Sequence, residues 1–371
     1  METKEKVRHA WVRWAVAAGI PAIALAVFYL FAGYRGFANA AVKYVSRPAK
    51  DLLGTVFSIV PFSVMELEYI IAGVFVIWFL VRTVLLVIKS DAKWRTLARR
   101  AAVLVLVAAY LFTAYLWLLG IDYRSDSFED KSGMDAGAVT TEDLYAVARY
   151  FILRAAETAG GVTRDPEGHF AEDMDGYFAG SKTIYGYLEE EFSFLTARSR
   201  TPKKMLLFSK ISSYMGFTGV YFPFSGESSI NIDAPGCLIP FTIAHELAHQ
   251  RGVYAEQEAN FVGIAACLSS GDPVYIYSGY LSGAIYLTNA LYKADPDRWY
   301  GLREAITGGM AVDWNDNNAY WRGFETKVTE VSEAVYDGYL RAYGQELGMR
   351  SYGACVDLLV AYYIDAARAV G

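Results

Sequence analysis

One pentapeptide in this chain has the composition and spacing of a metal site. His245, Glu246 and His249 form the pattern H-E-x-x-H. On a helix, residues four apart lie on the same face, so both imidazoles can bind one ion. Glu246 is rotated by about 100° from His245, which places its carboxylate beside the ion, where it can exchange protons with a water molecule. Imidazole nitrogens suit Zn²⁺, so we expect a zinc site with Glu246 as the catalytic residue.

The surrounding sequence argues against a chance match. The chain has only four histidines, and two of them are in this pentapeptide. Pro240 is acceptable in the first turn of a helix, and Gly252 is a natural residue to end one. These two residues predict a short helix with the motif in its middle. We interpret His169, which follows Pro166-Glu-Gly, as a loop residue and not as a ligand.

A zinc site of this type needs a third protein ligand, and the sequence offers two glutamates. The position six residues after His249, a histidine in metzincins, is Ala255. Glu256 and Glu258 begin the next predicted helix. On a helical wheel Glu258 lies about 50° from the centre of the apolar face, whereas Glu256 lies about 150° away, toward solvent. Because an acid beside an apolar face needs a partner, we predict Glu258 as the third ligand and keep Glu256 as the alternative.

The elements around the motif are predicted to be mostly helical. An amphipathic helix begins at Thr141, and further helices are expected over residues 182–195 and 203–215. Residues 219–233 predict a hairpin, with Pro223 confining its strand to a sheet edge. This hairpin directly precedes the motif helix, so it could offer an edge strand to an extended peptide.

The first third of the chain has the composition of a membrane domain. Hydrophobic residues make up 54% of the sequence and charged residues 20%, below the roughly 25% of soluble domains. Apolar runs over about residues 14–31, 69–88 and 101–120 approach the roughly 20 residues that cross a bilayer. We interpret the first run as an anchor, with a signal peptide cleaved near residues 38–40 as the alternative. Residues 52–65 are too short to span and predict an interfacial or re-entrant segment.

Basic residues predict the orientation of these spans. They gather before the first run and after the second: Lys4, Lys6, Arg8, Arg13, Lys89, Lys93, Arg95, Arg99 and Arg100. Both regions should therefore face the cytoplasm, which places everything after Gly120 outside. Four basic residues between the first two runs argue against this orientation: Arg35, Lys43, Arg47 and Lys50.

The predicted fold class is mainly α, with three N-terminal transmembrane helices plus a mostly helical zincin-like domain that contains a small β-hairpin or sheet. We expect a membrane domain over 1–120, a linker over 121–136 and a zinc-metallopeptidase-like domain over 137–371. The apolar segments 273–292 and 351–369 are interpreted as buried core helices. Three scattered cysteines are interpreted as buried thiols, with a Cys237–Cys355 disulfide as the alternative.

The motif and its context resemble a known family. His245–His249, followed by Glu258-Ala-Asn-Phe261 and preceded by Tyr221-Phe-Pro-Phe-Ser-Gly-Glu and three spans, resembles an uncharacterised bacterial membrane-protein family regarded as zinc-peptidase-like. The resemblance extends from the first span to the Ser351-Tyr-Gly353 region and beyond. The Glu-Ala-Asn element is similar to that of ImmA/IrrE-type metallopeptidases, which implies that Glu258 ligates zinc. Thermolysin-like enzymes are less similar, because Val262 stands where they have aspartate. The resemblance implies no substrate.

These observations predict a zinc-dependent peptidase anchored in the plasma membrane, acting on a peptide, a protein or a cell-wall peptide. The alternative is a catalytically silent zinc-binding sensor or scaffold domain at the membrane surface. Tyr352 and Arg322 are guesses for the group that stabilises the oxyanion. The lipid bilayer is the expected partner, and a net charge of −6 without a basic stripe argues against nucleic acid. No acidic residue interrupts the three apolar runs, which argues against a transport component.

Overall fold

The computed structural model describes residues 2–134, 139–342 and 352–370 and divides the chain into two compact units. The N-terminal unit comprises Met1–Leu53 and Val64–Ser125, and the C-terminal unit comprises Gly54–Ser63 and Asp126–Gly371. The boundary after Ser125 falls within the linker predicted over 121–136. The segment between the first two candidate spans is itself divided between the units, because Gly54–Ser63 belong to the C-terminal unit.

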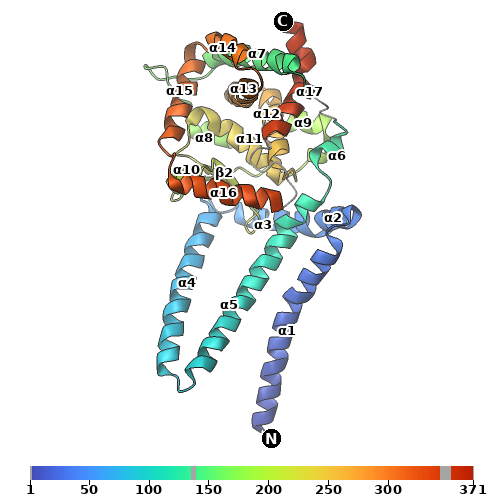
Figure 1. Cartoon of the computed structure of the whole chain (residues 1–371), viewed down its shortest axis with the longest axis vertical. Coiled ribbons are helices and arrows are strands. Elements are labelled where there is room, and N and C mark those ends of the chain that lie inside the picture. The colour runs from blue at the N-terminus through green and yellow to red at the C-terminus, as the bar shows by residue number, and fades with distance from the viewer. Residues whose placement is uncertain (1, 135–138, 343–351, 371) are drawn as a thin grey trace. The chain divides into compact units, whose positions relative to one another are not determined.

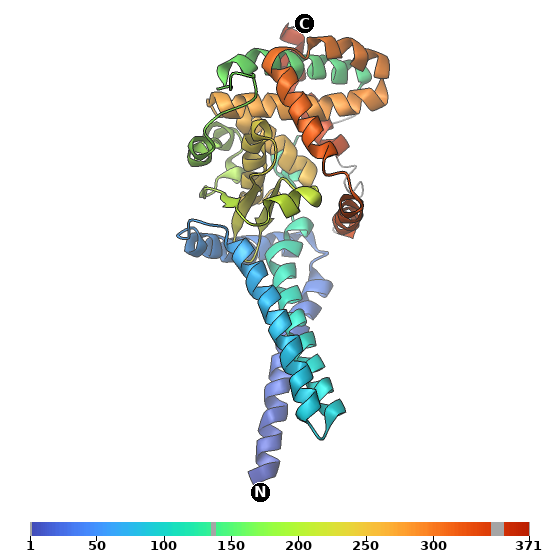
Figure 2. The ribbon, with the colours of Figure 1, turned by 90° about the vertical axis from the view of Figure 1, so that its left-hand side faces the viewer.

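The N-terminal unit consists of helices. They are α1 (Glu2–Phe31), α2 (Arg35–Ala41), the π-helical turn η1 (Val42–Ser46), α3 (Arg47–Phe57, which runs into the C-terminal unit), α4 (Val64–Lys89), α5 (Lys93–Tyr115), the π-helical turn η2 (Leu116–Gly120) and the 3₁₀ turn η3 (Asp122–Arg124). In Figures 1 and 2, α1 and α4 each lie alongside α5. Three stretches, Val12–Phe31, Val64–Lys89 and Lys93–Gly120, are long and apolar enough to cross a membrane. Their number and places agree with the sequence prediction. The predicted non-spanning segment 52–65 comprises the end of α3, the loop that follows it and the first two residues of α4.

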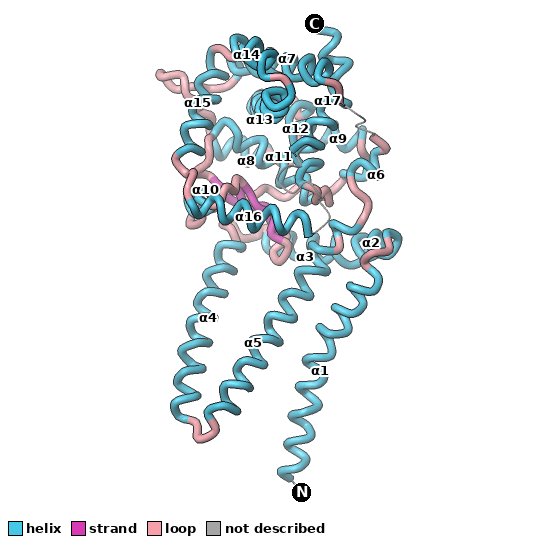
Figure 3. Tube along the Cα trace, in the orientation of Figure 1, coloured by secondary structure: helices cyan, strands magenta, loops and turns pink. Residues whose placement is uncertain are grey.

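The C-terminal unit is mostly helical with one small sheet (Figure 3). Its helices are α6 (Phe128–Ser132), α7 (Thr141–Thr158), α8 (Met174–Gly180), α9 (Gly186–Glu191), α10 (Ser209–Tyr214), α11 (Ile239–Gln250), α12 (Glu256–Ser269), α13 (Pro273–Ala294), α14 (Pro296–Leu302), α15 (Gly308–Arg322), α16 (Lys327–Ala342) and α17 (Tyr352–Val370). Its core lies where α7, α11, α12, α13 and α17 pack together. Fully buried side chains such as Tyr275, Leu281 and Leu358 show that α13 and α17 are core helices, as predicted.

The sheet has three strands in the order β1-β3-β2. Strands β2 (Gly219–Phe222) and β3 (Glu227–Asn231) form the predicted antiparallel hairpin, and Pro223 lies in the turn between them. β1 (Lys203–Met205) pairs in parallel with β3. The helix predicted over 203–215 is therefore wrong in its first part, because pairing with β3 outweighs the local preference of these residues.

Strand β3 attaches the sheet to the motif helix. Every residue of β3 is buried, although most are polar. The Ser228 hydroxyl donates a hydrogen bond to the backbone oxygen of Glu246 at 3.0 Å, and the Gln250 amide donates to the Ser228 hydroxyl at 3.0 Å. Buried polar side chains are stable when they are hydrogen-bonded in this way. The sheet therefore fixes α11 at the turn that carries the motif.

Candidate metal centre

Helix α11 brings the two motif histidines together as the sequence predicts. His245 and His249 lie one helical turn apart, and the centroids of their rings are 4.8 Å apart. Donor atoms of these two residues and of Glu246 lie within 4.8 Å of one another. The helix has Pro240 in its first turn, and Gly252 follows its end with a φ of +87°, a conformation that glycine adopts without strain.

The chain after α11 orients His249. Its Nδ1 atom lies 2.7 Å from the backbone oxygen of Val253. Because a carbonyl oxygen only accepts, Nδ1 must carry the hydrogen, and the Nε2 lone pair is then available to a metal ion. The ring of Tyr254 stacks on His249, with the centroids 5.9 Å apart and the planes 15° apart. The turn that ends the helix thus fixes both the orientation of the His249 ring and its tautomer.

Glu256, the first residue of α12, lies next to both imidazoles. Its Oε2 atom is 3.3 Å from Nε2 of His245, and its Oε1 atom is 3.8 Å from Nε2 of His249. Ligand atoms at 2.0–2.1 Å from a tetrahedral zinc ion are separated by about 3.3 Å. Two imidazole nitrogens and one carboxylate at these separations therefore fit a zinc ion that keeps a fourth position open.

Glu258, the third ligand predicted from the sequence, is hydrogen-bonded to the start of α6. It is buried, but its Oε2 atom accepts a hydrogen bond from the backbone N–H of Phe128 at 2.9 Å, and its Oε1 atom accepts one from that of Glu129 at 3.1 Å. These two N–H groups open α6, where a helix favours a negative charge. The partner of Glu258 is thus the N-terminus of α6. Glu256, the alternative third ligand, lies beside the imidazoles.

Glu246 is buried beside the imidazole pair. Its Oε2 atom has no hydrogen-bond partner among the described residues. A Cβ atom at Gly219 would lie 2.5 Å from Oε1 of Glu246, so only glycine leaves room for this carboxylate at the start of β2. Burial raises the pKa of Glu246 to about 8, with the nearby charge of His245 opposing the shift and that of Glu256 adding to it. A carboxylate that binds a proton near neutral pH suits general acid–base catalysis.

The charges of the imidazole pair and Glu256 act on each other. Burial opposes ionisation of Glu256, but hydrogen bonding to His245 and the charges of both histidines outweigh it and lower the pKa to about 2. Burial lowers the pKa of His245, but the hydrogen bond with Glu256 and the charges of Glu256 and Glu246 together outweigh burial, so the net shift is upward. Glu256 is therefore an anion at neutral pH, the form in which a carboxylate binds a metal ion.

Tyr336 of α16 also reaches this site, which the sequence did not indicate. Its hydroxyl donates a hydrogen bond to Oε1 of Glu256 at 2.6 Å. Nothing distinguishes this tyrosine from the other 27 in the sequence. Of the two earlier guesses, Arg322 donates its Nε–H to the backbone oxygen of Asn318 within α15, and the side chain of Tyr352 lies outside the described residues.

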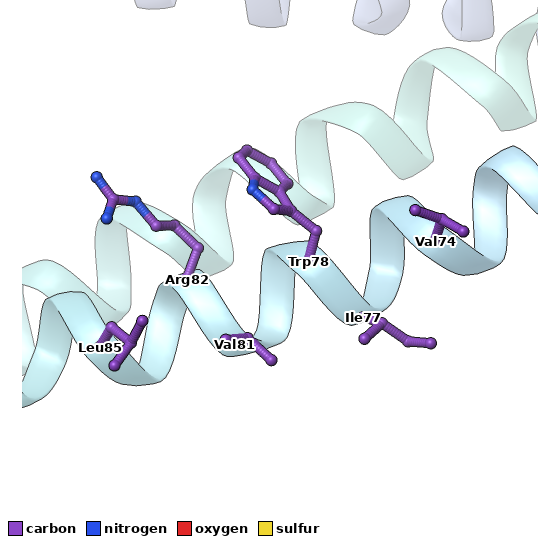
Figure 4. Close-up of a pocket in the computed structure, with 6 residues that line it drawn as sticks. All are labelled: Val74, Ile77, Trp78, Val81, Arg82 and Leu85. Carbon is purple, nitrogen blue, oxygen red and sulfur yellow. The ribbon is translucent and has the colours of Figure 1, made fainter.

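The pocket drawn in Figure 4 is not part of this site. It lies along α4, within a predicted span, and five of its six side chains are apolar: Val74, Ile77, Trp78, Val81, Arg82 and Leu85. A lipid-exposed helix surface normally has such a composition. It offers no group of the kind that the H-E-x-x-H chemistry needs.

Comparison with known proteins gives the family of the chain. Comparison with curated proteins found no match, and comparison with solved structures found none either. A family model matches residues 42–360, and its description is a protein of unknown function. This agrees with the resemblance to an uncharacterised family, whereas no zinc-peptidase family and no ImmA/IrrE-type similarity was found. Because the match covers most of the sequence, including the whole candidate metal centre, this chain belongs to the DUF3810 family.

Proposed function

We propose that this protein is a membrane-anchored zinc-dependent peptidase. The observation that carries the proposal is the placement of two glutamates around one imidazole pair. Glu256 lies against both rings at 3.3 and 3.8 Å, while the buried Oε2 atom of Glu246 has no hydrogen-bond partner in the part of the chain that the structure describes. A purely structural zinc site needs the first of these acids but has no use for the second.

The residues have separate roles in this proposal. His245, His249 and Glu256 hold the ion, which supplies Lewis acidity that polarises a peptide carbonyl and makes a water molecule easier to deprotonate. Glu246 takes a proton from the water that attacks the carbonyl carbon. When the C–N bond breaks, Glu246 gives this proton to the amine that leaves. One water molecule is consumed, and one acid and one amine are formed.

Strand β2 is the candidate for binding an extended substrate. It is an edge strand of the sheet, and its first residue, Gly219, contacts the carboxylate of Glu246. A peptide that added to this edge would pass directly beside the catalytic carboxylate. The ring of Tyr221, also on β2, lies 6.4 Å from that of His249. The sequence-based orientation places this site outside the cytoplasm, so a cell-surface or cell-wall peptide is the proposed substrate class.

The test compares the full-length protein with Glu246→Gln in lipid nanodiscs. Zinc is measured by mass spectrometry of the metal, and cleavage is measured on a diverse peptide library. We expect about one zinc ion per chain in both proteins and a loss of cleavage by about 100-fold or more in the variant. Equal cleavage by two fully loaded proteins would rule out the catalytic role of Glu246.

The sensor or scaffold alternative gives a different pattern in cells. If the site only holds the unit together, His245→Ala abolishes the cellular phenotype and Glu246→Gln leaves it intact. If the site hydrolyses peptides, both variants lose the phenotype. Comparing the two variants at matched expression therefore separates the two functions without knowledge of the substrate.

A further inference from the structure

Three segments of the C-terminal unit expose large apolar side chains. Ile59, in the segment that precedes α4, is 84% exposed. Leu206 and Leu207, between β1 and α10, are 62% and 63% exposed, and Val331 and Val335 of α16 are 63% and 69% exposed. Large apolar patches are uncommon on soluble surfaces and mark sites that contact another molecule or a membrane.

Hydrogen bonds connect these three segments to one another. The ammonium group of Lys203 donates to the backbone oxygens of Ser58, at 3.3 Å, and of Val60, which joins the first segment to β1. Strand β1 continues directly into Leu206 and Leu207. At the other end, the Ser332 hydroxyl of α16 donates to the backbone oxygen of Met215 at 2.8 Å, just after α10. Figure 1 shows α10 and α16 side by side.

The exposed side of α16 is a narrow stripe. Val328, Val331 and Val335 follow the i, i+3, i+7 spacing and so share one side of the helix. Tyr336, on the neighbouring side, contacts Glu256. Glu330 and Glu333 lie more than about 100° from the stripe. The helix thus presents apolar side chains in one direction and acids in another, as in a helix that lies at an interface.

The covalent structure indicates what covers this surface. Ser63 is the last residue of the first segment, and Val64 begins α4, which is long and apolar enough to cross a membrane. Ile59 is thus only five residues from a candidate span. A segment of n residues reaches at most about 3.5 Å per residue, so Ile59 lies within about 20 Å of the start of this span.

We propose that this apolar patch, defined by Ile59, Leu206, Leu207, Val328, Val331 and Val335, inserts into the lipid surface of the membrane that the protein spans. Burial of the side chains in the acyl region removes their apolar area from water, which supplies the driving force. Because burial of apolar area alone supplies this driving force, insertion needs no anionic lipid. A zwitterionic bilayer is therefore a sufficient partner.

The experiment measures contact with lipid directly. Full-length protein carrying Val331→Cys is labelled with a small fluorophore and placed, one copy per disc, in phosphatidylcholine nanodiscs with or without lipids that carry a quencher on the acyl chain. The native cysteines are buried, so the unsubstituted protein measures background labelling. Tyr300→Cys on α14 is the matched control, because Tyr300 is a large side chain with 54% exposure outside the patch.

We expect acyl-chain quenching at position 331 to exceed that at position 300 at least about twofold, and Leu207→Cys to behave like Val331→Cys. Equal, weak quenching at positions 331, 207 and 300 would overturn the proposal. Quenching that is absent in single-copy discs, together with protection of position 331 that increases with copy number, would also overturn it and would identify a second copy of the chain as the occupant. Leu207→Cys keeps the test decisive if Val331→Cys fails to fold.

Discussion

Gly219, the first residue of β2, lies close to the carboxylate of Glu246, and this close approach gives a test of the proposed peptidase activity. In Gly219→Ala the new Cβ atom would lie 2.5 Å from Oε1 of Glu246, so the carboxylate must move. Displacing a catalytic group by about 1 Å costs about 100-fold in rate. We expect a loss of this size in peptide cleavage, with zinc content unchanged. In the matched control, Gly301→Ala, nothing lies near the added methyl group, and activity should stay at the wild-type level.

Glu256 and Glu258 form a matched pair for testing the ligand set. Glu256→Gln removes the anion that lies against both imidazoles, so zinc content should fall. Glu258→Gln should keep its zinc, because this side chain bonds the N-terminus of α6 instead. Losing a charged acceptor at two buried N–H groups should lower the free energy of unfolding by about 1–3 kcal/mol. Metal analysis measures the zinc content of the two variants, and urea denaturation measures their free energies of unfolding. Zinc loss in Glu258→Gln but not in Glu256→Gln would support Glu258 as the ligand, as the sequence predicts.

Tyr336 is predicted to position Glu256 and not to touch the substrate. Tyr336→Phe removes the hydroxyl that bonds Oε1 of Glu256 and leaves the ring. Removing a partner of a metal ligand lowers metal affinity by about 10–100-fold. Competition with a zinc chelator measures this affinity independently of activity. Tyr300→Phe, which changes an exposed tyrosine, should leave the affinity unchanged, and an unchanged affinity in Tyr336→Phe would refute the positioning role.

The pairing of the two histidines was predictable from the sequence, and the position of Glu256 beside them was not. His245 and His249 lie on one helix, so their spacing alone puts them together. The choice between Glu256 and Glu258 used the face of α12, but Glu256 is the first residue of that helix and is placed by the turn before it. Glu258 does have the buried partner that its apolar surroundings require. This partner comes from α6, about 130 residues earlier in the chain, which no local pattern reveals.

At the scale of whole helices, the close packing of α12 on α11 positions the candidate metal centre. A Cβ atom at Gly263 would lie 2.9 Å from the backbone nitrogen of His245 and 3.0 Å from its Cα atom. Because these are backbone atoms, Gly263→Ala must move one helix away from the other. We expect a loss of about 1–3 kcal/mol in the free energy of unfolding and weaker zinc binding. Thermal denaturation with and without zinc measures both, with Gly301→Ala as the control; wild-type values would show that the helices adapt freely.

Long elements were easier to predict than short ones. The periodic patterns of α7, α11 and α13 extend over several turns, and the sequence located each of them. The short strand β1 forms only by pairing with β3, whose residues lie about 25 positions later in the chain. Helix α6 did leave a local signal, because Ser127 and Asp130 form a capping box. The polar composition of residues 121–136 concealed it, and the segment was interpreted as a linker.

The division of the chain into two units depends on contacts that the amino-acid composition does not reveal. Hydropathy located the three candidate spans, since each is long and almost free of charge. It distinguished residues 52–65 as a non-spanning segment but gave no reason to assign Gly54–Ser63 to the C-terminal unit. These residues belong to the C-terminal unit because Lys203 and Arg200 bond to them, through the backbone oxygen of Ser58 and the side chain of Thr55.

Lys50, one of the basic residues considered for the orientation in the membrane, forms a buried ion pair with Asp122. Lys50 was one of four basic residues that argued against a cytoplasmic N-terminus, but its ammonium group lies 2.6 Å from Oδ2 of Asp122, and both side chains are buried. Burial lowers the pKa of Lys50, with Asp122 opposing the shift. This pair forms in the folded protein, whereas the positive-inside rule counts Lys and Arg during insertion, so the predicted cytoplasmic side of the N-terminus and of the loop between α4 and α5 still rests on the larger number of basic residues there.

The resulting topology can be tested with reporter fusions in bacterial cells. We predict that alkaline phosphatase, which is active only outside the cytoplasm, is active when fused after Gly371 and inactive when fused after Asp91 in the loop between α4 and α5. A fluorescent protein that folds only in the cytoplasm should give the opposite pattern at both positions, which controls for expression. The reverse pattern for both reporters would place the candidate metal centre inside the cell and exclude cell-wall peptides as its substrates. The argument for these substrates rests on charges that act during insertion, whereas the candidate metal ligands are positioned by packing within the C-terminal unit.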